Sequence, residues 1–268
     1  MPSRILSIPF VLLLAFFGYM TWRVDESYLS YVIPLVIILV LIYVLGPQID
    51  WWWYERYPPD VDAPVRKMLE KTNPFYNRLN ETEKQKFRQR LQLFVTGTIY
   101  MPKGWEKIPE DAKFAIAANA VQLNFHKKEF LFPKYENVVV YPTPFPSPQY
   151  PEQFHPSEVF KEDGVLLFSA EQIMWGLLKP TQYYNVAMHE YVKVFMDNNS
   201  NLSFPDFTEE DWEGLSKAGP FDREHVHNLL NVPDIDPKVV AVTLFQLFPQ
   251  RFLKVFPEKG RKLVEIFS

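Results

Sequence analysis

The chain contains no cysteine, which excludes disulfide bonds, thiolate metal sites and cysteine nucleophiles. Glycine is also scarce, at 9 of 268 residues, and neither of the phosphate-binding loops GxGxxG and GxxxxGK[ST] occurs. Basic residues are not in surplus, because 28 Lys and Arg stand against 32 Asp and Glu. The resulting net charge of -4 gives no electrostatic reason to expect nucleic acid, and we predict no nucleic-acid partner.

Two long uncharged runs occupy the first fifty residues. Residues 5–22 and residues 28–45 each hold 18 residues without a charged side chain. As a helix, each run would reach roughly 27 Å, close to the ~30 Å hydrocarbon core of a bilayer. A cleaved signal peptide is the alternative for the first run, but no small-residue cleavage site follows it and the second run comes immediately. We therefore predict a transmembrane hairpin over residues 1–50.

Charge around the runs predicts the orientation of this hairpin. Arg4 precedes the first run and Arg56 follows the second, whereas the short link between the runs holds one Arg against Asp25 and Glu26. The positive-inside rule then predicts an integral membrane protein with both termini and the soluble domain in the cytoplasm. Residues 51–54 (WWWY) predict an aromatic belt at the lipid headgroups, with a buried strand as the alternative.

The remainder of the chain has the pattern of a globular protein. We interpret residues 51–79 as the aromatic belt and a linker helix, and residues 80–268 as one domain. Strands are predicted over residues 137–141 and 164–168, and helices over residues 62–71, 81–95, 109–125, 170–178, 183–196, 222–230, 236–248, 249–256 and 258–267.

The prolines and the order of elements complete the fold prediction. The proline-rich segment 142–158 predicts an extended surface loop, with a ligand for a proline-reading module as the alternative. Two predicted helices, two strands and then many helices indicate an α+β, mostly helical fold and not an alternating βαβ sheet.

One stretch begins like the HExxH signature of zinc peptidases and then departs from it. In NVAMHEYVKVF, His189 and Glu190 open the motif, but Lys193 stands where the second histidine belongs. A protonated lysine has three N–H donors and no lone pair, so it cannot bind zinc. The sequence also lacks the GxSxG motif, so nothing in it indicates a serine hydrolase. On these residues alone, a metal site is not the favoured interpretation.

Several segments around this motif resemble the family of Mlc titration factor A, zinc-dependent peptidases whose core is akin to the catalytic domain of anthrax lethal factor. Between residues 88 and 257 the resemblance is carried by LFVTGTIYMPKGWEKIPEDAKFAIAANAVQL, ENVVVYPTPF, GVLLFSAEQIMWGL, NVAMHEYVKVFMDNNSN and VVAVTLFQLFPQRFLKVFPE. It implies a zincin-like metallopeptidase core with a small sheet. The N-terminal hairpin lies outside the resemblance.

The resemblance also assigns functional positions. The family's first zinc-binding histidine corresponds to His189 and its catalytic glutamate, a general base, corresponds to Glu190. Its second histidine corresponds to Lys193. Its third ligand, a glutamate on a late helix, corresponds to Thr243, and no Asp or Glu occurs anywhere between Lys238 and Arg251. Two of the three expected protein ligands are therefore missing, and His189 and Glu190 are interpreted as vestigial.

Other residues do not rebuild the site. His225 and His227 form a close pair, but residues two apart on a helix point in different directions, so a polar helix face is favoured. His155 is expected at the surface of the proline-rich loop.

Lys193 has two predicted partners on its own helix. It can reach Glu190, three residues earlier, and we predict that its ammonium replaces the missing zinc charge. A Lys193–Asp197 pair is predicted as well, because Asp197 lies four residues further on.

These interpretations predict a membrane-anchored, cytoplasmic pseudopeptidase that needs no cofactor. The member that names the family sequesters a transcriptional repressor, so the resemblance implies a protein-binding or regulatory role with a protein partner. The alternatives are an active membrane-bound zinc-dependent peptidase with an altered metal site, and a structural membrane protein without a ligand.

Overall fold

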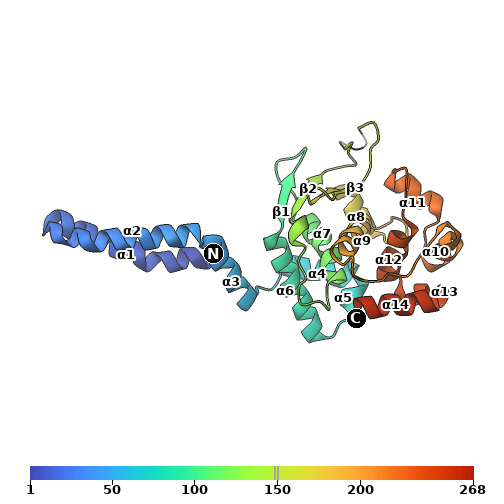
Figure 1. Ribbon diagram of the computed structural model, residues 1–268, viewed down its shortest axis with the longest axis horizontal. Helices are drawn as coiled ribbons and strands as arrows, with labels where there is room; N and C mark the ends of the chain where they lie inside the picture. The colour runs from blue at the N-terminus through green and yellow to red at the C-terminus, as the bar shows by residue number, and fades with distance from the viewer. Residues whose placement is uncertain (148, 150) are drawn as a thin grey trace. The chain divides into compact units, whose positions relative to one another are not determined.

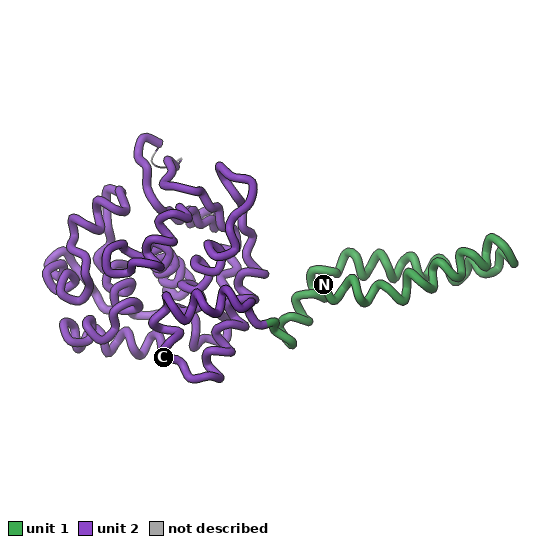
Figure 2. The backbone as a smooth tube through the Cα atoms, turned by 180° about the vertical axis from the view of Figure 1, so that it is seen from behind, with its two compact units in different colours: residues 1–59 green, residues 60–268 purple. Residues whose placement is uncertain are grey.

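The computed structural model describes residues 1–147, 149 and 151–268. These residues form two compact units, unit 1 (Met1–Pro59) and unit 2 (Asp60–Ser268), which Figure 2 shows in different colours.

Unit 1 contains an antiparallel pair of apolar helices. Helix α1 (Pro2–Arg23) and helix α2 (Leu29–Val44) lie side by side (Figure 1), joined through the 3-10 turn Glu26–Tyr28. Two helical spans, Pro2–Arg23 and Glu26–Val44 (α2 with the preceding 3-10 turn), are long and apolar enough to cross a membrane. None of their apolar window is buried within the unit, so this surface needs apolar surroundings.

A third helix closes unit 1 at the other end of the pair. Helix α3 (Gly46–Arg56) contains residues 51–54, so the alternative of a buried strand is wrong, and Trp52 and Trp53 are exposed. The Asp50 carboxylate accepts hydrogen bonds from Ser3 N at 2.7 Å and Ser3 Oγ at 3.0 Å. Asp50 therefore caps the first turn of α1, where backbone N–H groups lack partners within the helix.

Unit 2 is mostly helical and carries a small sheet, which confirms the predicted α+β class. Its elements are α4 (Ala63–Thr72), α5 (Pro74–Arg78), α6 (Glu81–Gly97), β1 (Ile99–Pro102), α7 (Glu110–Leu123), β2 (Asn137–Tyr141), β3 (Ser157–Phe160), β4 (Val165–Ser169), α8 (Ala170–Leu178), α9 (Val186–Asn198), α10 (Trp212–Ala218), α11 (Arg223–Leu230), α12 (Pro237–Leu247), α13 (Pro249–Val255) and α14 (Pro257–Phe267), with 3-10 turns at Pro133–Tyr135 and Glu209–Asp211.

Side-chain caps account for where several of these helices begin. Asn80 and Glu83 form the two hydrogen bonds of a capping box at the start of α6. The side chain of Ser169 caps α8, and that of Asn185 caps α9 by accepting from Met188 N at 2.9 Å. The cap at Asn185 fixes the first turn of the helix that carries the HE pair.

The sheet has the strand order β1-β2-β4-β3, with β3 antiparallel at one edge and the other neighbours parallel. Strands β1 and β3 were not predicted. β3 begins inside segment 142–158, so the prediction of a loop is wrong for Ser157 and Glu158. Backbone N–H groups become available again after Pro156, and this short run pairs with β4.

A tight turn joins β3 to β4. It ends at Gly164, whose φ of +63° lies in the left-handed region, and a Cβ built there would lie 1.8 Å from the Lys134 carbonyl oxygen. Only glycine fits this close approach of two backbone segments.

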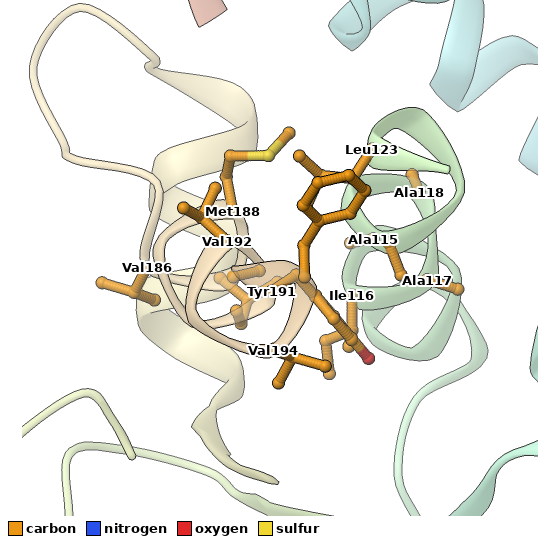
Figure 3. Close-up of a cluster of buried hydrophobic side chains, with 14 of the residues drawn as sticks. Ala115, Ile116, Ala117, Ala118, Leu123, Val186, Met188, Tyr191, Val192 and Val194 are labelled. Atoms are coloured by element: carbon orange, nitrogen blue, oxygen red, sulfur yellow. The ribbon is translucent and has the colours of Figure 1, made fainter. Parts of the chain in front are cut away.

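Helix α9 lies in the core of unit 2, against the sheet and between other helices (Figure 1). Figure 3 shows its buried side chains, among them Met188 and Tyr191, beside the short alanine side chains of α7. Tyr191 packs against Phe168 of β4 at a ring distance of 6.0 Å. Such packing holds α9 in one position, and with it the polar residues of the HE pair.

Candidate functional site

The HE pair of α9 is buried. His189 and Glu190 expose 2% and 1% of their surface, so neither polar group has more than a trace of water around it. Buried polar side chains need hydrogen-bonding or charged partners to offset their lost hydration. The direct partners of these two residues come from β3, from α9 itself and from the segment before α9.

His189 is held by a chain of hydroxyl groups. Its Nδ1 lies 2.9 Å from Tyr184 Oη, and the Thr243 side chain lies beside the same Tyr184 hydroxyl. Thr243 Oγ1 donates its own proton to the Val239 carbonyl oxygen at 2.8 Å.

Burial keeps this chain uncharged. It lowers the pKa of His189 well below its usual value, and the nearby Lys193 ammonium lowers this pKa further. Burial raises the pKa of Tyr184. At neutral pH, the chain therefore links a neutral imidazole to two neutral hydroxyl groups.

Glu190 is held from two sides. Its Oε1 accepts a hydrogen bond from Ser157 Oγ at 2.8 Å, and its Oε2 lies 3.0 Å from Lys193 Nζ. In the described part of the chain no well-aligned hydrogen bond reaches Oε2, so its contact with Lys193 is an ion pair. The Lys193 side chain is 33% exposed, so the ion pair is hydrated on the lysine side and buried on the carboxylate side.

The structure does not pair Lys193 with Asp197, so that prediction is wrong. Asp197 accepts a hydrogen bond from Tyr135 Oη at 2.7 Å and another from Lys134 Nζ at 3.0 Å. These two bonds, the tyrosine first, lower the pKa of the Asp197 carboxyl. Both partners come from the 3-10 turn before β2, which sequence spacing along one helix could not reveal.

The described side chains do not fit a zinc ion. Zinc needs three or four ligands, and Lys193 at the second histidine position is paired with Glu190. Thr243 carries no carboxylate, and its hydroxyl donates to the Val239 carbonyl oxygen. Across residues 1–147, 149 and 151–268, no three His, Cys, Asp or Glu side chains are grouped so as to hold a metal.

Among the described residues, no side-chain hydrogen bond joins the HE pair to His155, His225 or His227. His225 is exposed on α11, against Phe221, and His227 lies on the same helix. His155 is fully buried, so the expectation of a surface residue is wrong, and its Nε2 lies 3.1 Å from Glu158 Oε2. Because side chains alternate along β3, Glu158 points to the sheet face opposite the one that meets α9.

A cleft of about 890 Å³ opens beside Lys193. It is lined by the end of β3 and the following turn, the second half of α9, the start of α12 and one residue of the proline-rich segment: Val159, Phe160, Lys161, Glu162, Asp163, Lys193, Met196, Asp197, Ser200, Asp236, Val239 and Gln149. A volume of this size suits a drug-sized ligand or a short stretch of polypeptide.

Strand β3 has an unpaired edge. Ser169 N–H donates to the Pro156 carbonyl, so Glu158 and Phe160 are the residues that exchange hydrogen bonds with β4. The N–H and C=O groups of Ser157 and Val159 then point away from β4. Within the described residues these backbone groups have no hydrogen-bond partner. Ser157 is only 3% exposed, so the edge is open to the cleft at Val159, which is partly exposed and lines it.

Two comparisons with known proteins give matches to the chain. The model of the glucose-regulated metallo-peptidase M90 family matches residues 50–210, a range that includes α9 and ends before α12. An uncharacterized protein of Synechocystis sp. (strain PCC 6803) is 24% identical over 172 residues, which cover 59% of the chain. The chain spans 62% of the length of that relative.

Proposed function

Because the chain belongs to the M90 family of glucose-regulated metallopeptidases, we propose that it binds polypeptides in the family's cleft without hydrolysing them. The observation that carries this proposal is the Lys193–Glu190 ion pair. A metallopeptidase uses its glutamate as a general base on a water that the metal has acidified. Here the ammonium occupies one oxygen of that carboxylate and the Ser157 hydroxyl occupies the other. Glu190 is thereby a structural anion.

The free edge of β3 supplies a way to bind a polypeptide. An extended segment can add to a sheet edge through main-chain hydrogen bonds, while its side chains enter neighbouring pockets. The backbone N–H and C=O groups of Val159 offer such bonds beside the cleft. The bound chain would be a protein partner, and a regulatory role follows from binding without cleavage.

Zinc titration tests the loss of hydrolysis. Calorimetry on the detergent-solubilised full chain is expected to show no stoichiometric zinc binding, because Lys193 and Thr243 replace two ligands. Casein cleavage with added zinc should not exceed that of the Glu190→Gln variant. Stoichiometric sub-micromolar binding that is lost in His189→Ala, together with chelator-sensitive cleavage, would show an active enzyme instead.

We also propose that the hairpin anchors the chain with unit 2 in the cytoplasm. The charge bias around α1 and α2 supports this orientation. A reporter that is active only in the cytoplasm, fused after Ser268, is expected to give signal, and a reporter that needs export should give none. Matched fusions within the link at Asp25 should show the reverse. Export-dependent activity at Ser268 would contradict the orientation.

A further inference from the structure

Both lysines that line the cleft have a carboxylate partner, whereas most of the carboxylates that line it have no cation partner among the described residues. Lys193 lies 3.0 Å from Glu190, and Lys161 lies 3.9 Å from Asp197. Both cleft lysines therefore already have a carboxylate partner. The three remaining carboxylates of the cleft are those of Glu162, Asp163 and Asp236, and no cation in the described part of the chain pairs with them.

The positions of these carboxylates relative to β3 differ. Glu162 and Asp163 lie in the turn that directly follows β3, at one end of its free edge. Asp236 caps the first turn of α12 by accepting from Lys238 N at 2.8 Å. Its charge faces the cleft from the opposite wall, but its oxygen already has a structural role. Glu162 and Asp163 are thus the two carboxylates free to meet a ligand.

From this arrangement we propose that the cleft selects a polypeptide segment carrying lysine or arginine at the end that lies beside the β3–β4 turn. The inference rests on the proposed function and adds the chemical class of the partner. A basic side chain there meets two unpaired carboxylates, while the apolar Val159, Phe160 and Met196 accommodate its neighbours. An acidic segment would face those same carboxylates and could gain a cation only by separating Lys193 from Glu190 or Lys161 from Asp197.

Three labelled decapeptides test the charge preference. They share an alternating Thr/Val sequence suited to strand addition and carry two lysines, two serines or two glutamates at the same positions near one end. Each is titrated by fluorescence anisotropy against the detergent-solubilised full chain at low salt. We expect the lysine peptide to bind about three- to tenfold more tightly than the serine peptide, because exposed ion pairs are individually weak. The glutamate peptide should bind most weakly, and 0.5 M salt should remove the differences.

Two variants, each lacking two carboxylates, test whether the preference for the lysine peptide arises at Glu162 and Asp163. The Glu162→Gln/Asp163→Asn variant should lose the preference for the lysine peptide and keep its affinity for the serine peptide. The control Glu210→Gln/Glu224→Gln removes two exposed carboxylates outside the cleft and should keep the preference.

Other outcomes would contradict the charge selection, and one of them would also contradict polypeptide binding. Equal binding of the lysine and glutamate peptides, or equal behaviour of the two variants, would refute the charge selection and leave polypeptide binding standing. Failure of all three peptides to bind the unmodified chain would refute polypeptide binding in the cleft, and the charge selection with it.

Discussion

The Lys193→Met variant is expected to lose about 2–3 kcal/mol of folding stability. Removing one partner of a buried ion pair costs about 3–5 kcal/mol, because the other charge remains buried and unpaired. We expect a loss of about 2–3 kcal/mol, below that range, because the Lys193 side chain is 33% exposed and water already screens part of its charge. Denaturant unfolding of the detergent-solubilised chain, followed by near-UV circular dichroism, measures the loss.

A double-mutant cycle separates the charge effect from other effects of the substitution. In Glu190→Gln/Lys193→Met, the buried charge is gone, and most of the lost stability should return. Lys161→Met is a matched control, because its 3.9 Å contact is to Asp197, which lies nearer the surface. We expect it to cost less than about 0.5 kcal/mol. If Lys193→Met were as stable as this control, Lys193 would not be holding Glu190.

The second large effect is the creation of a zinc site. The Lys193→His substitution places a second imidazole four residues after His189 on one helix face, and Thr243→Glu adds a carboxylate from α12. The Tyr184 hydroxyl contacts both His189 and Thr243, so the longer glutamate side chain has no room in the double variant. We expect the double variant to bind no stoichiometric zinc. Adding Tyr184→Ala should allow one zinc per chain, with a Kd of about 1 µM or tighter, as measured by calorimetry.

Two controls accompany this experiment. Tyr184→Ala alone should bind no zinc, and the triple variant should lose its zinc when His189 is also replaced by alanine. Zinc binding by the double variant at the same affinity would show that Tyr184 is no obstacle. A folded triple variant without zinc would show that position 243 does not face His189. Glutamate would then be tested at Val240, Leu244 and Leu247, which neighbour position 243 on α12.

The helices were predictable because their signals are local. Asn80 with Glu83, and Ser169, each mark a helix start within three residues of the cap, and the structure has helices at both places. Asn185 caps α9, so the predicted start of that helix at residue 183 was too early. Strands β1 and β3 have only four residues each. β1 pairs with β2, which is distant in sequence, whereas β3 pairs with β4 across a tight turn. No periodic pattern of useful length exists in so short a strand.

The same contrast applies to the candidate site. The contact of Lys193 with Glu190 was predictable, because both residues lie on one turn of a helix. The roles of Ser157 and Tyr184 were not. Ser157 reaches Glu190 from an unpredicted strand. Tyr184 falls within the helix predicted over residues 183–196, but in the structure it lies in the segment before α9, from which its hydroxyl reaches His189. One signal was available for Tyr184, since a buried imidazole five residues away needs a hydrogen-bond partner.

The close approach of Gly164 to Lys134 has a consequence for the entropy of binding. The turn that carries Glu162 and Asp163 is held by β3 on one side and β4 on the other, and its last residue lies against the backbone before β2. A loop fixed in this way has little conformational freedom left to lose when a ligand binds. The ordering cost therefore falls on the incoming segment alone, and a segment already extended in solution will bind this edge at the smallest cost.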